Sequence, residues 1–336
     1  MSRIKAWVAE SAGRAMECKE IDLGPLGDEE VEVQVEHCGL CHSDLSMFDN
    51  EWGMTGYPAT FGHEAIGRVV QLGKVAKGLK LGQRVGVGWA AESCMHCRSC
   101  LSGNQHLCPS YQGTIIGHKG GFAERVRSHW AWAIPLPDGL DPADAGPLLC
   151  GGITVFNPLA RHATPTDRVG IIGIGGLGHL GVKFAAAYGC EVTAITSSES
   201  KFDEARGFGA HKVVSSRDPN GLKTLAGSLD LILVTANAKL DWDGLIGALG
   251  TNGRMHIVGA VLEPIPVAAM SLIFGQKSLS GSPTGSPVDI AKMLEFAARH
   301  RVLPQTEHMS MSRINDAFAR LREGKARYRI VLDVDF

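Results

Sequence analysis

The pattern of apolar and polar positions changes near residue 150 of the chain. Before that point, short segments alternate apolar and polar residues, which is typical of half-buried strands. The clearest of them lie at 31–38 (VEVQVEHC), 65–73 (AIGRVVQLG) and 82–89 (GQRVGVGW), and glycines mark turns or bulges around them. This part of the chain therefore predicts a compact, barrel-like β domain that carries loops.

After residue 150, apolar runs of strand length alternate with segments of helical character. The predicted strands lie at 168–174, 190–196, 211–215, 229–236, 254–260 and 277–282. The predicted helices between them lie at 177–189, 201–209 and 242–249. Six strands with intervening helices predict a doubly wound parallel sheet.

The end of the chain adds an amphipathic helix at 286–300 and a strand-like segment at 327–336. We expect that last strand to return to the first domain. The predicted fold is therefore α/β with a β-rich domain. We expect the β-rich domain to span 1–152 and to be completed by 286–336, and the α/β domain with the doubly wound sheet to span 153–285.

Charge and termini narrow the function classes. The formal net charge of the 336 residues is -2, so a polyanion-binding role has no electrostatic support. The amino terminus lacks the apolar core of a signal peptide. No run of about 18 uninterrupted apolar residues is present. We expect a cytoplasmic protein that binds neither nucleic acid nor a membrane.

Four of the nine cysteines form a tight cluster in the sequence. An odd number of cysteines argues against a complete disulfide framework, and clustered cysteines in a reduced chain more often bind metal. Cys94, Cys97, Cys100 and Cys108 have the spacing of one tetrahedral site in a polar loop, where the metal would replace a core. An iron–sulfur cluster fits the same spacing but needs a redox role that nothing else suggests. We predict a closed, structural zinc site.

Three further candidate ligands are scattered along the chain. Cys41 lies in GLCHSDL, His63 in FGHEAIG and Cys150 in GPLLCGG. Each is weak alone, but together and in this order, ahead of a dinucleotide fold, they predict a zinc site with one position open for water or substrate. The remaining cysteines are expected to be small buried thiols without chemistry: Cys18, Cys38 and Cys190.

A glycine-rich turn follows the first apolar strand after residue 150. Gly173, Gly175 and Gly178 form G-x-G-x-x-G at the start of a predicted helix, where a phosphate can approach backbone amides. Gly176 adds room, and Leu177 belongs to the same turn. The alternative is the turn of an α/β unit that binds nothing.

The end of the second strand distinguishes the two nicotinamide cofactors. A site that prefers NAD places Asp or Glu there to bind the ribose 2′-OH. Here Thr196, Ser197 and Ser198 occupy the position, with Lys201 behind them, and hydroxyls with an ammonium suit a 2′-phosphate. Glu199 lies past the expected contact and is interpreted as a cap of the next helix. We predict NADPH over NADH.

With these motifs the chain resembles the zinc-containing medium-chain alcohol dehydrogenases along its full length. The resemblance is closest to the cinnamyl-alcohol-dehydrogenase-like branch, and within it to bacterial NADP-dependent broad-range aldehyde reductases. It implies a GroES-like, barrel-type catalytic domain joined to a Rossmann domain. Besides the cysteine cluster, the matching segments are GLCHSDL (39–45), GHEAIGRV (62–69), GPLLCGGITVF (146–156), GIGGLGHLG (173–181) and GKARYRIVL (324–332).

The resemblance assigns roles around the open zinc site. It implies that Cys41, His63 and Cys150 hold the catalytic zinc, and that a second zinc is structural. Glu64 would approach the catalytic metal from behind. Asp44 matches the carboxylate that orients the ligand His63.

The same resemblance places a proton relay and the cofactor contacts. Ser43 matches a hydroxyl that passes a proton to or from the reacting oxygen. Ser46 stands where many relatives end this relay with His, so we expect protons to leave through the cofactor ribose and water. Backbone of segments 257–261 and 280–285 would line the nicotinamide. The other implied cofactor contacts are His42 at the pyrophosphate, Thr154 near the nicotinamide, and Val258, Ser280 and Ser282 in those segments.

The expected substrate is a small uncharged molecule. Trp52, Trp89 and, less strongly, Phe61 are candidates for an apolar pocket, with ordinary core packing as the alternative. No Arg or Lys stands out for a substrate carboxylate or phosphate. We predict reversible reduction of aliphatic and aromatic aldehydes to primary alcohols with NADPH. The resemblance also implies a homodimer or a tetramer, with the dimer favoured, built partly on pairing of nucleotide-domain sheets.

Three other functions fit part of the sequence. A zinc-free quinone or enone reductase would lack both metal sets. A zinc-ribbon module for nucleic acid would need only the cysteine cluster, but the near-neutral charge and the absence of a basic stripe argue against it. A protein that binds NADPH without catalysis would not need an intact three-ligand set.

Overall fold

The computed structural model describes residues 3–218 and 220–336. The chain divides into two compact units. Unit 1 comprises Met1–Ile153 and Thr284–Phe336, and unit 2 comprises Thr154–Pro283. No helix in the described ranges is long and apolar enough to cross a membrane.

Unit 1 is built on a sheet of seven strands in the order β16-β17-β3-β4-β5-β9, with β8 also pairing with β3. Its strands are β3 (Glu30–Leu40), β4 (Ala65–Leu72), β5 (Arg84–Val87), β8 (Arg125–His129), β9 (Ala133–Pro135), β16 (Thr306–Ser310) and β17 (Arg329–Asp333). Two short antiparallel ladders accompany it: β1 (Arg3–Val8) with β2 (Glu17–Asp22), and β6 (Ala90–Glu92) with β7 (Gln112–Gly113). This arrangement confirms the predicted β-rich domain.

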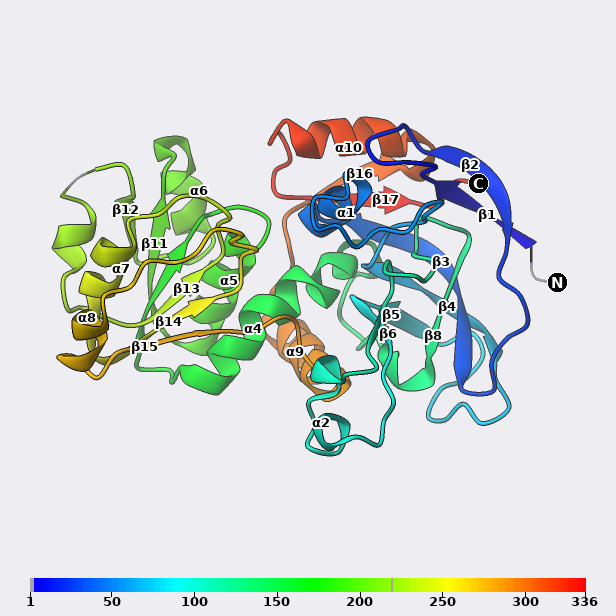
Figure 1. Ribbon diagram of the computed structural model, residues 1–336, viewed down its shortest axis with the longest axis horizontal. Coiled ribbons are helices and arrows are strands. Elements are labelled where there is room, and N and C mark those ends of the chain that lie inside the picture. The colour runs from blue at the N-terminus through cyan, green and yellow to red at the C-terminus, as the bar shows by residue number, and fades with distance from the viewer. Residues whose placement is uncertain (1–2, 219) are drawn as a thin grey trace. The chain divides into compact units, whose positions relative to one another are not determined.

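The C-terminal strand β17 pairs with the sheet of the first unit. β17 pairs antiparallel with β3, so that Leu332 lies opposite Cys38, and Figure 1 shows the red strand beside the blue one. The middle of β17 is fully buried, which explains why this apolar segment returns to the sheet. Sequence distance therefore hides one of the central pairings of the domain.

Short helices cover and connect the strands of unit 1. They are α1 (His42–Phe48), α2 (Arg98–Leu101), α3 (Pro142–Ala145), α9 (Pro287–His300) and α10 (Ile314–Arg322), with 3-10 turns η1 (Gln105–Leu107), η2 (Trp130–Trp132), η3 (Gly146–Leu149) and η6 (Met311–Arg313). The predicted helix at 286–300 is α9, which begins at a capping box between Ser286 and Asp289. Phe61 is fully buried, with its ring centroid 6.1 Å from that of Phe48. It belongs to the core and not to a substrate pocket.

Unit 2 contains six parallel strands in the order β12-β11-β10-β13-β14-β15 (Figure 1). They are β10 (Arg168–Ile172), β11 (Glu191–Thr196), β12 (Lys212–Ser215), β13 (Leu229–Val234), β14 (Leu249–Ile257) and β15 (Ser278–Gly281). Numbered along the sequence, this is the 3-2-1-4-5-6 order of dinucleotide-binding sheets, which confirms the predicted doubly wound fold.

The helices of unit 2 alternate with its strands. They are α5 (Gly178–Tyr188), α6 (Phe202–Gly207), α7 (Trp242–Ala248) and α8 (Ala269–Ile273), with η4 (Glu199–Lys201) and η5 (Leu222–Leu225) between them. The helix α4 (Gly151–His162) carries the chain from unit 1 into unit 2. α5 ends at Gly189, whose φ of 101° requires glycine.

Three expectations from the sequence need correction. β14 begins at Leu249, five residues before the predicted strand, because Leu249 already pairs with Leu229. A register shift follows this pair, and the segment TNG there has the composition of a turn, which hid the start of the strand. Cys18 is exposed and not buried, because it lies on β2, in a two-stranded ladder at the surface. Glu199 is not a helix cap, because Ser198 precedes η4 and Lys201 precedes α6, and neither start has a side-chain cap.

Candidate metal centres and cofactor loop

The open metal set assembles in the interior of unit 1. Cys41 immediately precedes α1, His63 and Glu64 precede β4, and Cys150 lies between η3 and α4. All four are buried, and one ligand atom from each lies within 4.8 Å of the others. The two sulfurs are 3.9 Å apart, close to the separation of about 3.8 Å set by Zn–S bonds of about 2.3 Å in a tetrahedron.

Asp44 joins the two segments that carry the first ligands. Its carboxylate accepts hydrogen bonds from His63 Nδ1 at 2.9 Å, from the backbone amide of Cys41 at 3.0 Å and from that of Gly62 at 2.9 Å. Because Nδ1 then carries the hydrogen, the lone pair of His63 is left on Nε2. Asp44 therefore sets both the tautomer and the orientation of the imidazole.

The buried polar atoms around this set are incompletely satisfied. In the described part of the chain, His63 Nε2, Glu64 Oε2 and Arg329 Nε have no hydrogen-bond partner. Buried polar atoms seldom lack partners, so an orphaned imidazole nitrogen near two sulfurs fits a metal ion. A hydrogen bond from the Cys150 thiol also lowers the pKa of Cys41 well below its usual value, helped by the charges of Arg329 and His63. The donor set therefore fits zinc.

Arg329 is the member of this site that the sequence did not indicate. It lies on β17, is 3% exposed and donates to Glu64 Oε1 in a short contact. Burial raises the pKa of Glu64 to about 7, while the charge of Arg329 opposes that rise. Gly39 makes room for this carboxylate, because a Cβ there would lie 2.0 Å from Glu64 Oε2. The matching segment 324–332 contains Arg329, but only the pairing of β3 with β17 brings its side chain to Glu64.

The first turn of α1 holds the predicted relay residues. Ser43 Oγ lies 3.9 Å from Cys41 Sγ and is half-buried. Ser46 Oγ donates to Glu51 Oε2 at 2.7 Å, so the position where a relay could end is hydrogen-bonded to a carboxylate. His42 is exposed at the start of the helix. The start of this helix thus brings together a metal ligand, an imidazole and a hydroxyl in succession, at Cys41, His42 and Ser43.

An aromatic wall stands beside His63. The ring of Trp89 meets the His63 imidazole edge to face, with centroids 4.8 Å apart, and Trp52 contacts Trp89 at 6.2 Å. Tyr111 donates its hydroxyl to the Trp89 carbonyl at 3.2 Å, and burial raises its pKa. Trp52 and Trp89 are only partly buried against the core. Core packing therefore does not use the full surface of these two rings. Tyr111 is a further residue of this aromatic wall that the sequence did not suggest.

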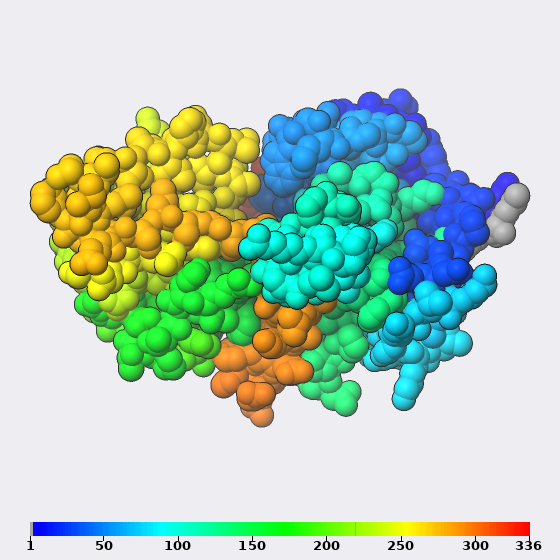
Figure 2. Space-filling view, turned by 60° about the horizontal axis from the view of Figure 1, so that its bottom comes forward, coloured from blue at the N-terminus to red at the C-terminus, as the bar shows by residue number. Residues whose placement is uncertain are grey.

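The second cysteine set is closed. Cys94, Cys97, Cys100 and Cys108 offer four sulfurs within 4.8 Å of one another, with individual separations of 3.5 to 3.9 Å. This spacing fits tetrahedral thiolate coordination of zinc without an open position. The loop lies on the surface of unit 1 (cyan in Figure 2). His96 is exposed and its Nδ1 contacts the Cys94 carbonyl, so it is not a ligand.

The glycine-rich loop of unit 2 has the close approaches that its motif predicts. Gly173 has a φ of 91°, and a Cβ on Gly178 would lie 2.0 Å from the Gly173 carbonyl oxygen. A Cβ on Gly175 would meet nothing within 4 Å, so this side of the loop is open to a ligand. Gly176 belongs to the same turn, and Leu177 directly precedes α5. The residues therefore fit a dinucleotide phosphate at the start of α5.

The end of β11 carries hydroxyls and one ammonium. Thr196 is buried and its Oγ1 accepts from the Ser198 amide at 3.3 Å, whereas Ser197 is exposed. Lys201 Nζ donates to the carbonyl of Ile174 in the glycine-rich loop at 2.7 Å. The cation therefore stands between the β11 end and that loop, where a phosphate on the ribose is expected.

The carboxyl ends of β14 and β15 are tied together by a histidine. His256 contacts Ser280 Oγ through Nδ1 and Ser282 Oγ through Nε2, both at 2.9 Å. Burial lowers the pKa of His256 to about 4, with His162 and Arg254 adding to the effect. The side chains of both serines are therefore used within unit 2, which leaves backbone contacts for a cofactor. Val258 follows β14, and Thr154 is 7% exposed on α4.

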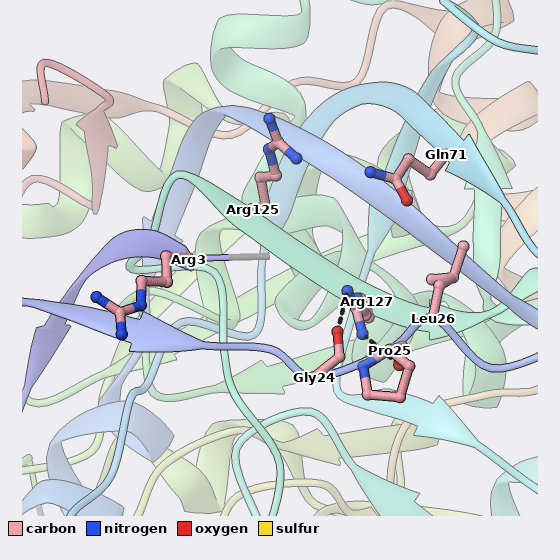
Figure 3. Close-up of a pocket in the computed structure, with 7 residues that line it drawn as sticks. All are labelled: Arg3, Gly24, Pro25, Leu26, Gln71, Arg125 and Arg127. Atoms are coloured by element: carbon pink, nitrogen blue, oxygen red, sulfur yellow. Dashed lines mark hydrogen bonds between the residues drawn. The ribbon is translucent and has the colours of Figure 1, made fainter. Parts of the chain in front are cut away.

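A separate cavity of roughly 400 Å³ in unit 1 has no part in these sites. It is lined by Arg3, Gly24, Pro25, Leu26, Gln71, Arg125 and Arg127 (Figure 3). Arg127 donates to the carbonyls of Gly24 and Pro25, drawn as dashed lines, and to the buried carboxylate of Glu32. Because its main cation is satisfied by the protein itself, this cavity is structural.

Comparison with known proteins places both units in one family. Residues 27–138 match the alcohol dehydrogenase GroES-like domain, and residues 176–299 match the zinc-binding dehydrogenase family. The chain is 48% identical over 330 residues to the aldehyde reductase AdhA of Synechocystis sp., which covers 98% of each chain.

Two solved structures share the whole fold. A cinnamyl alcohol dehydrogenase from Sorghum bicolor has a TM-score of 0.94 at 36% identity, covering 99% of this chain and 98% of its own. The enzyme CAD from Helicobacter pylori, solved in complex with NADP(H), has a TM-score of 0.90 at 27% identity, covering 98% of each chain. The chain therefore belongs to the zinc-containing medium-chain alcohol dehydrogenases, in their cinnamyl-alcohol-dehydrogenase-like branch, and is a zinc-dependent alcohol dehydrogenase or aldehyde reductase.

Proposed function

We propose that this enzyme reduces uncharged aliphatic and aromatic aldehydes reversibly to primary alcohols with NADPH. The observation that carries the proposal is the open set of Cys41, His63 and Cys150 beside the aromatic wall of Trp52 and Trp89. The similarity of the chain to an aldehyde reductase supports reduction as the direction of the reaction. Unit 1 would be the catalytic domain, and unit 2 would bind the dinucleotide.

The residues divide the catalytic work among them. When bound, zinc supplies the Lewis acid that polarises a carbonyl, and the reduced nicotinamide supplies the hydride. Cys41, His63 and Cys150 would hold the metal, with Glu64 behind it, and Asp44 keeps the imidazole in place. Ser43 would pass a proton to the oxygen of the reduced substrate. Trp52 and Trp89 would shield that region from water.

The preference for NADPH rests on the end of β11. Thr196, Ser197 and Ser198 offer hydroxyls where an NAD site has a carboxylate, and Lys201 adds a positive charge near the glycine-rich loop. His42, Thr154, Val258 and the backbone at Ser280 and Ser282 would complete the cofactor contacts. The NADP(H) complex of the Helicobacter pylori relative supports the same choice.

The substitution Ser197→Asp tests the cofactor preference. A carboxylate at this exposed position would repel a 2′-phosphate, so the ratio of kcat/KM for NADPH to that for NADH should fall at least about tenfold, or 1.4 kcal/mol. Initial rates with benzaldehyde and each cofactor measure the ratio. Ser11→Asp makes the same charge change on an exposed serine of unit 1 and should leave it unchanged.

The outcomes of that experiment separate the cofactor from the reaction. An unchanged ratio in Ser197→Asp would refute the role of the β11 end. Failure of the unaltered enzyme to reduce benzaldehyde and aliphatic aldehydes with either cofactor would refute the proposed reaction itself.

We also propose that the enzyme is a homodimer joined through unit 2, with a tetramer as the alternative. β15 is an edge strand that pairs only with β14 among the described strands. Large apolar side chains are exposed beside it, with Phe274 exposed at 85% and Ile273 at 62%. An unpaired edge strand with exposed apolar neighbours favours pairing with a second copy.

The dimer is tested by Phe274→Glu, which should yield monomers in light scattering coupled to size-exclusion chromatography. Leu101→Glu is the matched control, because Leu101 is exposed at 76% on the zinc loop of unit 1 and should leave the dimer intact. A monomeric unaltered enzyme, or a Phe274→Glu variant that stays dimeric, would contradict the proposed interface.

The cysteines also support a cytoplasmic location. All nine are free. Six of them belong to the two metal sets, and two more, Cys38 and Cys190, are buried. Thiols that must stay reduced to hold metal suit a reducing compartment. We therefore propose that the enzyme works in the cytoplasm.

A further inference from the structure

A group of imidazoles and carboxylates lies outside both cysteine-containing sets. His37 is on β3, His308 on β16 and Asp333 on β17, three neighbouring strands of the sheet in unit 1. Asp333 lies directly opposite His37, and His308 pairs with Val331, two residues before Asp333. Because side chains alternate along a strand, this register places all three on one face of the sheet.

The ligand atoms of these three residues converge. One atom of each lies within 4.8 Å of the others. His37 Nδ1 lies 2.7 Å from Asp333 Oδ1, and His308 Nδ1 lies 3.0 Å from the same oxygen. Two imidazole nitrogens from different strands therefore point at one place, which a single carboxylate oxygen fills.

A second carboxylate supports the group from the other side. His308 Nε2 lies 3.2 Å from Asp144 Oδ1 on α3, and Thr306 Oγ1 donates to that same oxygen. With neutral imidazoles, the two aspartates give the group two negative charges. The local field therefore favours a positive charge at this position.

We propose that His37, His308 and Asp333 form a third metal site, which takes a divalent transition ion such as Zn²⁺ or Ni²⁺. Imidazole nitrogens with a carboxylate oxygen suit these ions, whereas Mg²⁺ and Ca²⁺ require oxygen ligands. Asp144 is the positioning residue that holds the far nitrogen of His308, in the carboxylate–histidine–metal arrangement.

The observed geometry needs only a small adjustment to bind an ion. Metal–ligand bonds of about 2.0 to 2.2 Å place tetrahedral ligands about 3.4 Å apart. The two imidazole nitrogens lie 2.7 and 3.0 Å from Asp333 Oδ1, so each separation would grow by less than about 1 Å. The side chains are 24% (His37), 35% (His308) and 39% (Asp333) exposed, so they can shift and water can complete the coordination. The same exposure gives the ion a path to the site.

Occupation of the site would link β3, β16 and β17, and two of these strands lead to residues in or beside the open metal set. β3 leads into Cys41, β17 carries Arg329, and the helix α3 that holds Asp144 precedes Cys150. An ion that binds only the folded state stabilises it. The melting temperature of the enzyme should therefore rise with free Zn²⁺ after both cysteine sets are full.

The test is a metal count on untagged holoenzyme equilibrated with increasing free Zn²⁺. We expect three ions per chain for the unaltered enzyme, one for each of the three groups. His308→Gln should retain two ions and bind the third at least about tenfold more weakly, since even supporting residues alter metal affinity by 10- to 100-fold. His300→Gln removes an exposed histidine outside the groups and should retain three ions.

Spectroscopy with Co²⁺ as the third ion gives a readout that does not depend on activity. At the proposed site, Co²⁺ added to zinc-loaded enzyme should show only weak visible bands, without the strong charge-transfer bands of thiolate ligands. His37→Gln should abolish these bands while the two zinc ions remain. A stoichiometry of two for the unaltered enzyme, or a third ion that binds equally well to His308→Gln and His37→Gln, would overturn the proposal.

Discussion

Substitution of His63 by alanine should remove the catalytic ion and lower kcat/KM for aldehyde reduction by about 10³-fold or more. His63 supplies the one nitrogen of the open set, and its Nε2 is buried without a hydrogen-bond partner in the described chain. A Lewis acid stabilises the developing charge by several kcal/mol, and each 1.36 kcal/mol is tenfold in rate. The measurement combines steady-state rates with a zinc count, which should lose one ion per chain.

His96→Ala is the matched control for this substitution. His96 lies in the other zinc loop, is exposed and contacts only a carbonyl through Nδ1. The zinc content and the activity of the His96→Ala variant should both match those of the unaltered enzyme. A correctly folded His63→Ala enzyme with near-normal activity would show that the open set does not carry the reaction.

Substitution of Cys97 by serine should release the structural ion and destabilise unit 1. Cys97 is one of four sulfurs that hold a polar loop, and Cys94 is already biased towards thiolate, because the backbone amide of His96 lowers its pKa to about 6. Without the metal this loop has little apolar surface to keep it folded. A loss of about 3 kcal/mol would lower the melting temperature of a unit of about 200 residues, such as unit 1, by roughly 6 to 12 °C.

Thermal unfolding and zinc content, measured on the same samples, check this expectation. Cys18→Ser provides the control, because Cys18 is exposed and belongs to neither set. It should retain both ions and its melting temperature. A Cys97→Ser enzyme that kept its melting temperature after loss of the ion would show that the loop is stable without metal.

The sequence predicted those parts of the molecule that depend on local patterns. The apolar runs at β10, β11 and β13 and the glycine-rich turn before α5 are contiguous in the chain, so periodicity and motif spacing were enough to identify them. The cysteine cluster was equally clear, because its four ligands lie within one loop. Cys41, His63 and Cys150 are far apart, so the sequence indicated them only through their joint occurrence ahead of a dinucleotide fold and through the resemblance to a family.

The features that the sequence could not reveal arise from pairings between distant segments. Arg329 meets Glu64 across 265 positions because β17 lies beside β3. His256 joins Ser280 and Ser282 because β14 and β15 run in parallel. In each case a side chain acquires its role from the register of a sheet, and single-sequence periodicity does not encode that register.

The most direct test of the account is the rate of NADPH oxidation with uncharged aldehydes while the ion of the open set is removed and restored. Zinc-replete enzyme should turn over benzaldehyde and butanal, lose this activity as the ion of the open set is removed, and regain it when zinc returns. Undiminished turnover in enzyme that has demonstrably lost the ion of Cys41, His63 and Cys150 would contradict the central claim.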